Sequence, residues 1–147
     1  MTMMNREVRT IMDTHPISVN PELTVDEISH MMLSRKTQQI PVVEDGKFVG
    51  LVTSYDLWRR AEHPKPGEKP ISQLKVRDVM TTRVIKISPK DKVGTAAELF
   101  ADRRFKTLPV VNLRDELKGM ITAFDIIKIV FNDEYSEKIL FKEEFSA

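Results

Sequence analysis

The sequence contains no cysteine, and this absence excludes disulfide bonds, thiolate metal ligands and a cysteine nucleophile. It also lacks an excess of charge of either sign, because 23 Lys and Arg residues against 22 Asp and Glu residues leave a formal net charge of +1. A balanced total gives no support to nucleic-acid binding, which relies on an excess of positive charge. No apolar run reaches the roughly 18 residues of a membrane span, and the N-terminus lacks the apolar run of a signal peptide. We therefore predict a cytoplasmic protein with no membrane span.

What the chain does contain is enough apolar material for a folded core. Hydrophobic residues make up 41% of the 147 residues and charged residues 31%, a balance that argues against intrinsic disorder. This length suits one compact domain or two very small ones.

An internal repeat organises the chain. Its two copies keep an offset of 68 residues until one extra residue in a turn of the second copy raises the offset to 69. The clearest matching segments are Val8–Met12 with Val76–Met80, Ile40–Val43 with Leu108–Val111, and Gly50–Asp56 with Gly119–Asp125. We predict repeats at 8–61 and 76–131, a linker rich in proline at 62–75, and a helical C-terminal tail at 132–147.

Each repeat is predicted to form strand, helix, strand, strand and helix. The alternating segments Ile17–Val19 and Ile85–Ile87 predict short first strands. The helix caps predicted are Thr24 for the first helix of copy one, Asp91 for its counterpart in copy two, and Thr53 for the second helix of copy one. Gly46 predicts a hairpin turn with positive φ. A repeat of this size buries too little surface to be stable alone, so the two are expected to pack face to face in an α/β (α+β) fold.

The motif Thr-x-x-Asp occurs in both copies, at Thr53–Asp56 and at Thr122–Asp125. As a helix N-cap it needs no ligand, because Thr and Asp can satisfy the first N–H groups of the helix. The same geometry also suits a ligand, because a helix start offers N–H groups to a phosphate and an acid one turn later can accept from ribose hydroxyls.

Three repeated signatures make the chain resemble a tandem pair of cystathionine-β-synthase (CBS) domains, a Bateman module. They are the apolar-Pro-Val-Val strand, the Gly-apolar-apolar-Thr-x-x-Asp segment, and the Val-Met-Thr-like opening segment at Val79–Thr81, which copy one replaces with Ile11–Asp13. The resemblance implies two pseudo-symmetric βαββα repeats packed through their sheets. It also implies clefts that bind adenine nucleotides or related adenosyl ligands. In larger family members, the module regulates an attached enzyme or channel. Because residues 132–147 are too few for a catalytic domain, a stand-alone CBS protein is expected.

The resemblance also assigns site residues. The ribose and phosphate would contact Thr53, Ser54, Asp56, Thr122 and Asp125, and the base would be lined by Gln39, Ile40, Pro41, Thr107, Leu108, Pro109, Thr14, Ile17, Thr82 and Ile85. The simpler interpretation of the apolar-Pro-Val segments is a buried sheet. Candidate phosphate contacts are Lys36, Arg104, Lys106, Arg83 and His15, although cations near a helix C-terminus also complement its dipole and His15 also suits an exposed loop. No histidine pair has metal-ligand spacing, so no metal site is predicted.

The function predicted from the sequence is a regulatory, ligand-sensing module with no obligatory cofactor and no catalysis. No Walker loop, nucleophile elbow or His-Glu-x-x-His helix is present. Apolar residues on the helices that follow each Thr-x-x-Asp motif, including Trp58 and the segment Ile126–Phe131, favour a homodimer through these helices; the alternative is burial between the two copies of one chain. A regulated partner protein is also expected. The competing hypothesis is a scaffold for dimerisation or protein interaction that needs no ligand.

Overall fold

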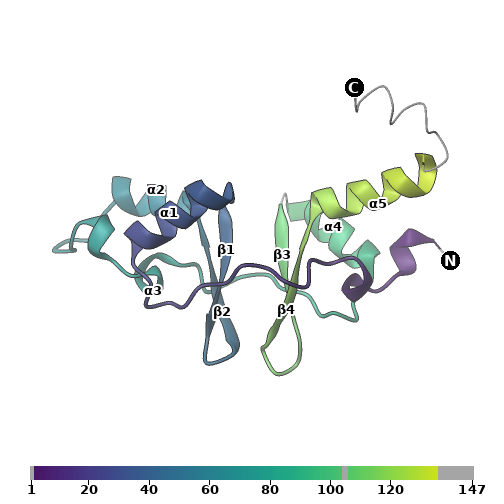
Figure 1. Cartoon of the computed structure of the whole chain (residues 1–147), viewed down its shortest axis with the longest axis horizontal. Coiled ribbons are helices and arrows are strands. Elements are labelled where there is room, and N and C mark those ends of the chain that lie inside the picture. Colours follow the sequence, from purple (N-terminus) through teal and green to yellow (C-terminus); the bar gives the residue numbers. More distant parts are fainter. Residues whose placement is uncertain (1, 104–105, 136–147) are drawn as a thin grey trace.

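The computed structural model describes residues 2–103 and 106–135. Two antiparallel hairpins lie side by side at the centre, and helices cover the outer side of each hairpin (Figure 1). The helices are α1 (Val25–Arg35), α2 (Ser54–Glu62), α3 (Val76–Val79), α4 (Val93–Arg103) and α5 (Ala123–Tyr135), with short 3-10 helices η1 (Met3–Asn5), η2 (Val8–Thr10) and η3 (Ile71–Gln73). The strands are β1 (Gln39–Glu44), β2 (Lys47–Thr53), β3 (Thr107–Val111) and β4 (Leu117–Thr122). The predicted α+β fold is confirmed, and the part of the predicted tail at 136–147 lies outside the described residues.

The turns of the first repeat follow their sequence signals. The hydroxyl of Thr24 accepts a hydrogen bond from the Glu27 N–H (3.2 Å) at the start of α1. In the β1–β2 turn, Asp45 and Gly46 have φ values of 52° and 78°, the two left-handed residues that a tight hairpin turn requires. The predictions for Thr24 and Gly46 are therefore confirmed.

The predicted cap of α4 is wrong. The Asp91 carboxylate accepts a hydrogen bond from the Ser88 N–H (2.7 Å), so it closes the turn before the helix instead of capping it. The first turn of α4 is supported by the Lys92 carbonyl, which accepts from the N–H groups of Thr95 (3.0 Å) and Ala96 (3.3 Å).

The predicted first strands shrink to one bridged residue each. Val19 and Ile87 form single parallel bridges to Val42 and Val110. The Val19 N–H donates to the Pro41 carbonyl (3.1 Å), and the Val43 N–H donates to the Val19 carbonyl (2.9 Å). The next bond of a parallel ladder would need an N–H from Pro41, which proline does not have. Pro109 ends the pairing of Ile87 in the same way.

Each hydrophobic core is completed by a segment from the other repeat, which the repeat pattern did not predict. The first core contains Val76 and Val79, whereas the second core contains Val8. We call Val8–Met12 and Val76–Met80 the crossing segments. After them, Thr81 pairs with Leu51 of β2 and Asp13 pairs with Met120 of β4, so each hairpin gains a bridge from the other half of the sequence.

The glycine of each Gly-apolar-apolar-Thr-x-x-Asp signature lies where a crossing segment passes. A Cβ atom on Gly50 would lie 2.8 Å from the Thr81 carbonyl oxygen, and one on Gly119 would lie 2.6 Å from the Asp13 carbonyl oxygen and 2.7 Å from the Met12 sulfur. These glycines are therefore needed for close packing, since neither has a positive φ.

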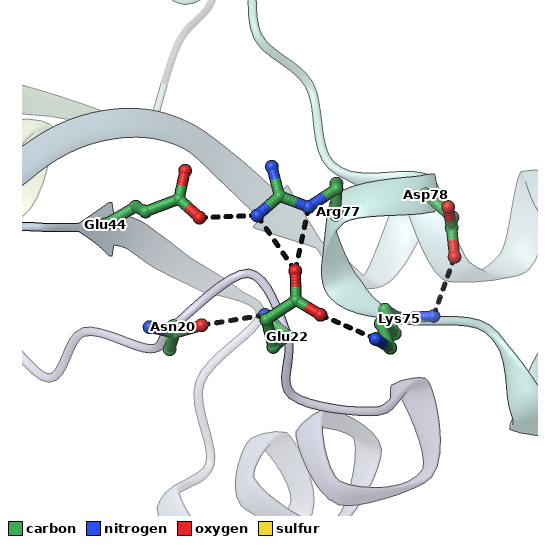
Figure 2. A network of polar contacts seen from close by, with 6 residues as sticks. All are labelled: Asn20, Glu22, Glu44, Lys75, Arg77 and Asp78. Carbon is green, nitrogen blue, oxygen red and sulfur yellow. Dashed lines mark hydrogen bonds and ion pairs between the residues drawn. The ribbon is translucent and has the colours of Figure 1, made fainter.

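An exposed ion-pair network holds the second crossing segment on the first core (Figure 2). Glu22 accepts hydrogen bonds from Lys75 Nζ (2.6 Å) and Arg77 Nε (2.9 Å), and Arg77 also pairs with Glu44. The hydrogen bonds from Lys75 and then Arg77 hold the pKa of the Glu22 carboxyl below its usual value. Because the Glu22 pKa is lowered, these contacts stabilise the folded protein at pH values above the pKa that Glu22 has in the unfolded chain. This stabilisation is lost as the pH falls through the lowered pKa of the folded state.

One charge pair of this network is reversed in the other half. At the offset of 68 residues, Lys75 corresponds to Glu7 and Glu22 corresponds to Lys90. After its hydrogen bond with Arg9, the Glu7 carboxyl is influenced by Lys92 and Lys90, which also lower its pKa. The residue just before each crossing segment, Lys75 or Glu7, therefore meets charge of opposite sign on the core where the segment docks, and it would meet charge of like sign on the other core.

Candidate functional site

The first Thr-x-x-Asp motif forms a capping box at the start of α2. The Thr53 hydroxyl accepts from the Asp56 N–H (3.1 Å), and Asp56 Oδ2 accepts from the Thr53 N–H (2.9 Å) and hydroxyl (2.9 Å). The second carboxylate oxygen accepts from the Thr81 hydroxyl (3.0 Å), which belongs to the other repeat. Asp56 therefore connects the start of α2 to the residue that follows the second crossing segment.

The second motif repeats the cap at the start of α5 with a different neighbour. Asp125 Oδ2 accepts from the Thr122 N–H (2.9 Å), and the Asp125 N–H donates to the Thr122 hydroxyl (3.0 Å). The residue equivalent to Thr81 is Asp13, whose carboxylate accepts from the His15 N–H (2.9 Å). A hydroxyl in one half is thus replaced by a carboxylate in the other.

Beside the first motif lies a cavity of about 590 Å³, which we call pocket A. Its lining includes the start of α2 in the first repeat and the segment 81–85 of the second repeat (excluding Thr82). The predicted site residues that line it are Gln39, Thr53, Ser54, Asp56, Arg83, Ile85, Lys106 and Thr107. Arg59, one turn into α2, lines it too, and sequence reasoning missed it.

A second cavity of about 640 Å³, pocket B, adjoins the second repeat. It combines residues 13 and 15–17, the end of α1 and the start of β1 from the first repeat with Met120 and Thr122 of β4. The predicted site residues that line it are His15, Ile17, Lys36, Gln39, Ile40, Pro41, Lys106, Thr107 and Thr122. Asp13 and Arg35 also line it and were not among the predicted site residues.

Some predicted site residues lie outside both cavities. Among the residues described, those that line neither pocket are Thr14, Thr82, Leu108, Pro109 and Asp125, and Arg104 lies outside the described part of the chain. The Leu108 side chain is buried in the second core, and Thr14 and Thr82 are exposed. Asp125 is half-buried next to Thr122, which does line pocket B.

Both pockets therefore combine the helix start of one repeat, or the strand that leads to it, with the opening segment of the other. The model of the CBS domain family matches residues 8–57 and 76–132, which are the two copies of this arrangement. The chain belongs to the CBS domain family.

Relatives of this CBS pair include both short proteins and parts of larger enzymes. The chain is 29% identical to the CBS domain-containing protein MJ0729 of Methanocaldococcus jannaschii over 135 residues, which are 88% of this chain and 99% of that protein. It is 31% identical over 115 residues to inosine-5'-monophosphate dehydrogenase of Aquifex aeolicus, which are 78% of this chain and 22% of that enzyme. The chain thus spans only about a fifth of the first dehydrogenase it matches.

Solved CBS pairs share the fold. The crystal structure of CBSX2 in complex with AMP superposes with a TM-score of 0.78 at 26% sequence identity, and it covers 87% of this chain and 98% of CBSX2. Within residues 2–103 and 106–135, no helix of this CBS pair has the length and apolar character to span a bilayer. The same residues contain no group of three or more His, Asp and Glu side chains arranged to hold a metal ion.

Proposed function

We propose that this CBS pair is a regulatory module that binds adenosine-containing nucleotides in pockets A and B. The observation that carries the proposal is that residues of both repeats line each pocket, so that a pocket forms only when the two repeats are packed together. The AMP complex of CBSX2, 26% identical to this chain, supports the ligand class. No covalent chemistry and no obligatory cofactor are part of the proposed role, which we place in the cytoplasm.

In pocket A, the ribose would lie beside Asp56. Its hydroxyls would donate to the carboxylate oxygen that now accepts from Thr81, and the cap to Thr53 would stay in place. The Tyr55 N–H at the start of α2 and the Ser54 hydroxyl would face the phosphate, where the positive end of the helix favours an anion. The N–H groups of Ser54 and Asp56 already donate to protein oxygens. Arg83 and Arg59 add positive charge to the same pocket.

In pocket B, the base would lie against Ile17 and the Ile40–Pro41 backbone, an apolar wall with few polar groups. The Thr122 hydroxyl, which lines this pocket at the end of β4, would contact the phosphate. The Asp125 carboxylate, which lies next to Thr122 and outside the pocket lining, would accept from the ribose hydroxyls. Lys36 and Arg35 also line this pocket and add positive charge to it.

Regulation would follow from the position of the pockets between the repeats. A ligand that contacts both repeats stabilises the relative placement that fits it best, and it shifts the population toward that state by its difference in affinity. The readout would be the geometry of a dimer or the affinity for a partner protein.

Ligand binding should raise the thermal stability of the full chain. At a concentration of 100 times its dissociation constant, a bound nucleotide adds about 2.7 kcal/mol, which corresponds to a rise in Tm of roughly 5–10 °C for a chain of this size. We expect the shift with at least one of AMP, ADP, ATP and S-adenosylmethionine, measured by differential scanning calorimetry. Asp56→Ala or Asp125→Ala should abolish or reduce it.

A matched control separates loss of the ligand from loss of the cap. Thr24, the N-cap residue of α1, lines neither pocket. Thr24→Ala removes this cap at a similar cost in folding free energy, about 1 kcal/mol. This variant should melt earlier and still show the full ligand shift. Equal ligand shifts in the wild type and in both aspartate variants would contradict the assigned site.

We also propose that α2 and α5 form a homodimer surface. Apolar side chains stay exposed on both helices, which lie along the same edge of the protein (Figure 1). The exposed fractions are 59% for Trp58, 64% for Phe124 and 60% for Ile127, so burial between the two repeats of one chain, the alternative interpretation of the sequence, is wrong for these residues.

Charges on this surface should therefore separate the dimer. We expect the wild-type chain to sediment at twice its 17.0 kDa mass and the double variant Trp58→Glu/Ile127→Glu to sediment as a monomer. Leu113→Glu is the matched control, because Leu113 is fully exposed in the β3–β4 turn and should leave the dimer intact. A monomeric wild-type chain, or a dimer that both variants retain, would contradict the proposed surface.

The exposed apolar surface on α2 and α5 also supports a second candidate function, a dimerisation scaffold that needs no ligand. This scaffold would form the dimer without any change in Tm across the nucleotide panel, whereas the nucleotide sensor shows both.

A further inference from the structure

The two pockets share one wall. Among the residues described, Gln38, Gln39, Lys106 and Thr107 line both cavities. At the offset of 68 residues, Gln38 corresponds to Lys106 and Gln39 to Thr107, so the wall is built from equivalent positions of the two repeats. It therefore lies where the pseudo-symmetric halves meet.

The backbone places this wall next to both helix starts. The Gln38 carbonyl accepts a hydrogen bond from the Ser54 N–H at the start of α2 (2.9 Å), and the Lys106 carbonyl accepts from the Ala123 N–H at the start of α5 (3.2 Å). The Gln38 side chain therefore branches beside the first Thr-x-x-Asp motif, and the Lys106 side chain branches beside the second.

The wall is symmetric in position but not in charge. Where one repeat has the neutral amide of Gln38, the other has the cation of Lys106, and Lys106 is the one charged side chain among the described residues that line both pockets. The other cations are divided between the pockets, with Arg59 and Arg83 in pocket A and Arg35 and Lys36 in pocket B.

We infer that Lys106 serves both pockets in turn and makes them compete for anionic ligands; this inference rests on the proposed nucleotide binding. A lysine ammonium is a compact point charge on a flexible stem, so it can turn toward a phosphate on either side but cannot pair fully with both. The first nucleotide takes the ammonium. The second then binds without it and is also repelled by the phosphate already present.

The coupling applies to the anion and not to the nucleoside. A neutral ligand such as adenosine gains nothing from Lys106 and should fill the two pockets independently. For AMP, we expect the second binding step to be weaker by roughly fivefold, at the low end of coupling between sites because Lys106 is exposed. Higher salt should reduce the difference, since ions screen exposed charges.

The experiment titrates AMP into the full chain by isothermal calorimetry, with and without Lys106→Met. Removing the ammonium should weaken the first step about fivefold, as the loss of one coupled contact predicts, and should leave the second step nearly unchanged. Lys65→Met, a change of an exposed lysine in the linker, is the matched control and should change neither step. Adenosine affinities should be the same in all three proteins.

Single-pocket variants decide whether the lysine is shared. In Asp56→Ala, AMP should bind only pocket B, and in Asp125→Ala only pocket A; Lys106→Met should weaken binding in both backgrounds. A response in only one background, or two AMP-binding steps with unaltered spacing in Lys106→Met, would overturn the shared-lysine inference and leave the proposed function standing. If wild-type chain binds neither AMP nor adenosine, the proposed function itself fails.

Discussion

Replacing Val8 with Asp is expected to destabilise the half of the protein that contains the second repeat, although Val8 opens the first repeat in the sequence. Val8 is fully buried in the second core beside Ile87, Leu108 and Ile121. A carboxylate placed there without a partner should cost about 3–5 kcal/mol of folding free energy. Hydrogen exchange should show loss of amide protection in β3 and β4 before any loss in β1 and β2.

Two further variants make this test specific to the crossing. Val76→Asp should give the mirror result, with protection lost first in β1 and β2, because Val76 is buried in the first core. Val8→Ala, at a cost of about 2 kcal/mol, should keep the chain folded while it weakens the same amides as Val8→Asp. Loss of protection in β1 and β2 on changing Val8 would contradict the crossed arrangement.

Gly119→Val is expected to destabilise the protein by about 3 kcal/mol, the upper range for forcing extra atoms into a packed site. The neighbour that an added Cβ would meet at 2.6 Å is the backbone carbonyl of Asp13, which cannot turn aside as a flexible side chain can. The cost is therefore a displacement of the first crossing segment from β4. Chemical denaturation of the purified chain measures the change, and Gly119→Ala should show a smaller loss in the same direction.

The neighbouring position provides the control for strand preference. Lys118 is exposed in the same strand, and valine suits a strand, so Lys118→Val should change the unfolding free energy by less than about 0.5 kcal/mol. A loss of similar size in Lys118→Val and Gly119→Val would show that the close approach to Asp13 is not the cause.

Local signals in the sequence predicted local structure well. The cap at Thr24, the turn at Gly46 and the capping box at Thr53 depend on residues within a few positions of one another, and all three are present in the structure. The two first strands were overestimated, because the residue that stops each ladder is a proline far along the chain. Pairing partners of this kind are not visible in the alternation of one segment.

The site was predicted less completely, because each pocket joins residues from both repeats. The motif pattern identified Thr53 and Asp56, but it gave no sign that Thr81 of the other repeat would donate to Asp56. Arg59 was missed because a single arginine on an exposed helix face is common. Its position one turn after Asp56 is the signal that could have identified it.

The crossing segments have a consequence for a chain cleaved between the repeats. The stretch 63–67 is exposed, and Glu68 beyond it pairs with Arg60 of α2 (2.9 Å). A protease that cut this stretch would leave one fragment holding Val8 and the other holding Val76. Neither fragment could leave without pulling a buried side chain out of its neighbour, so the nicked protein would persist as one particle.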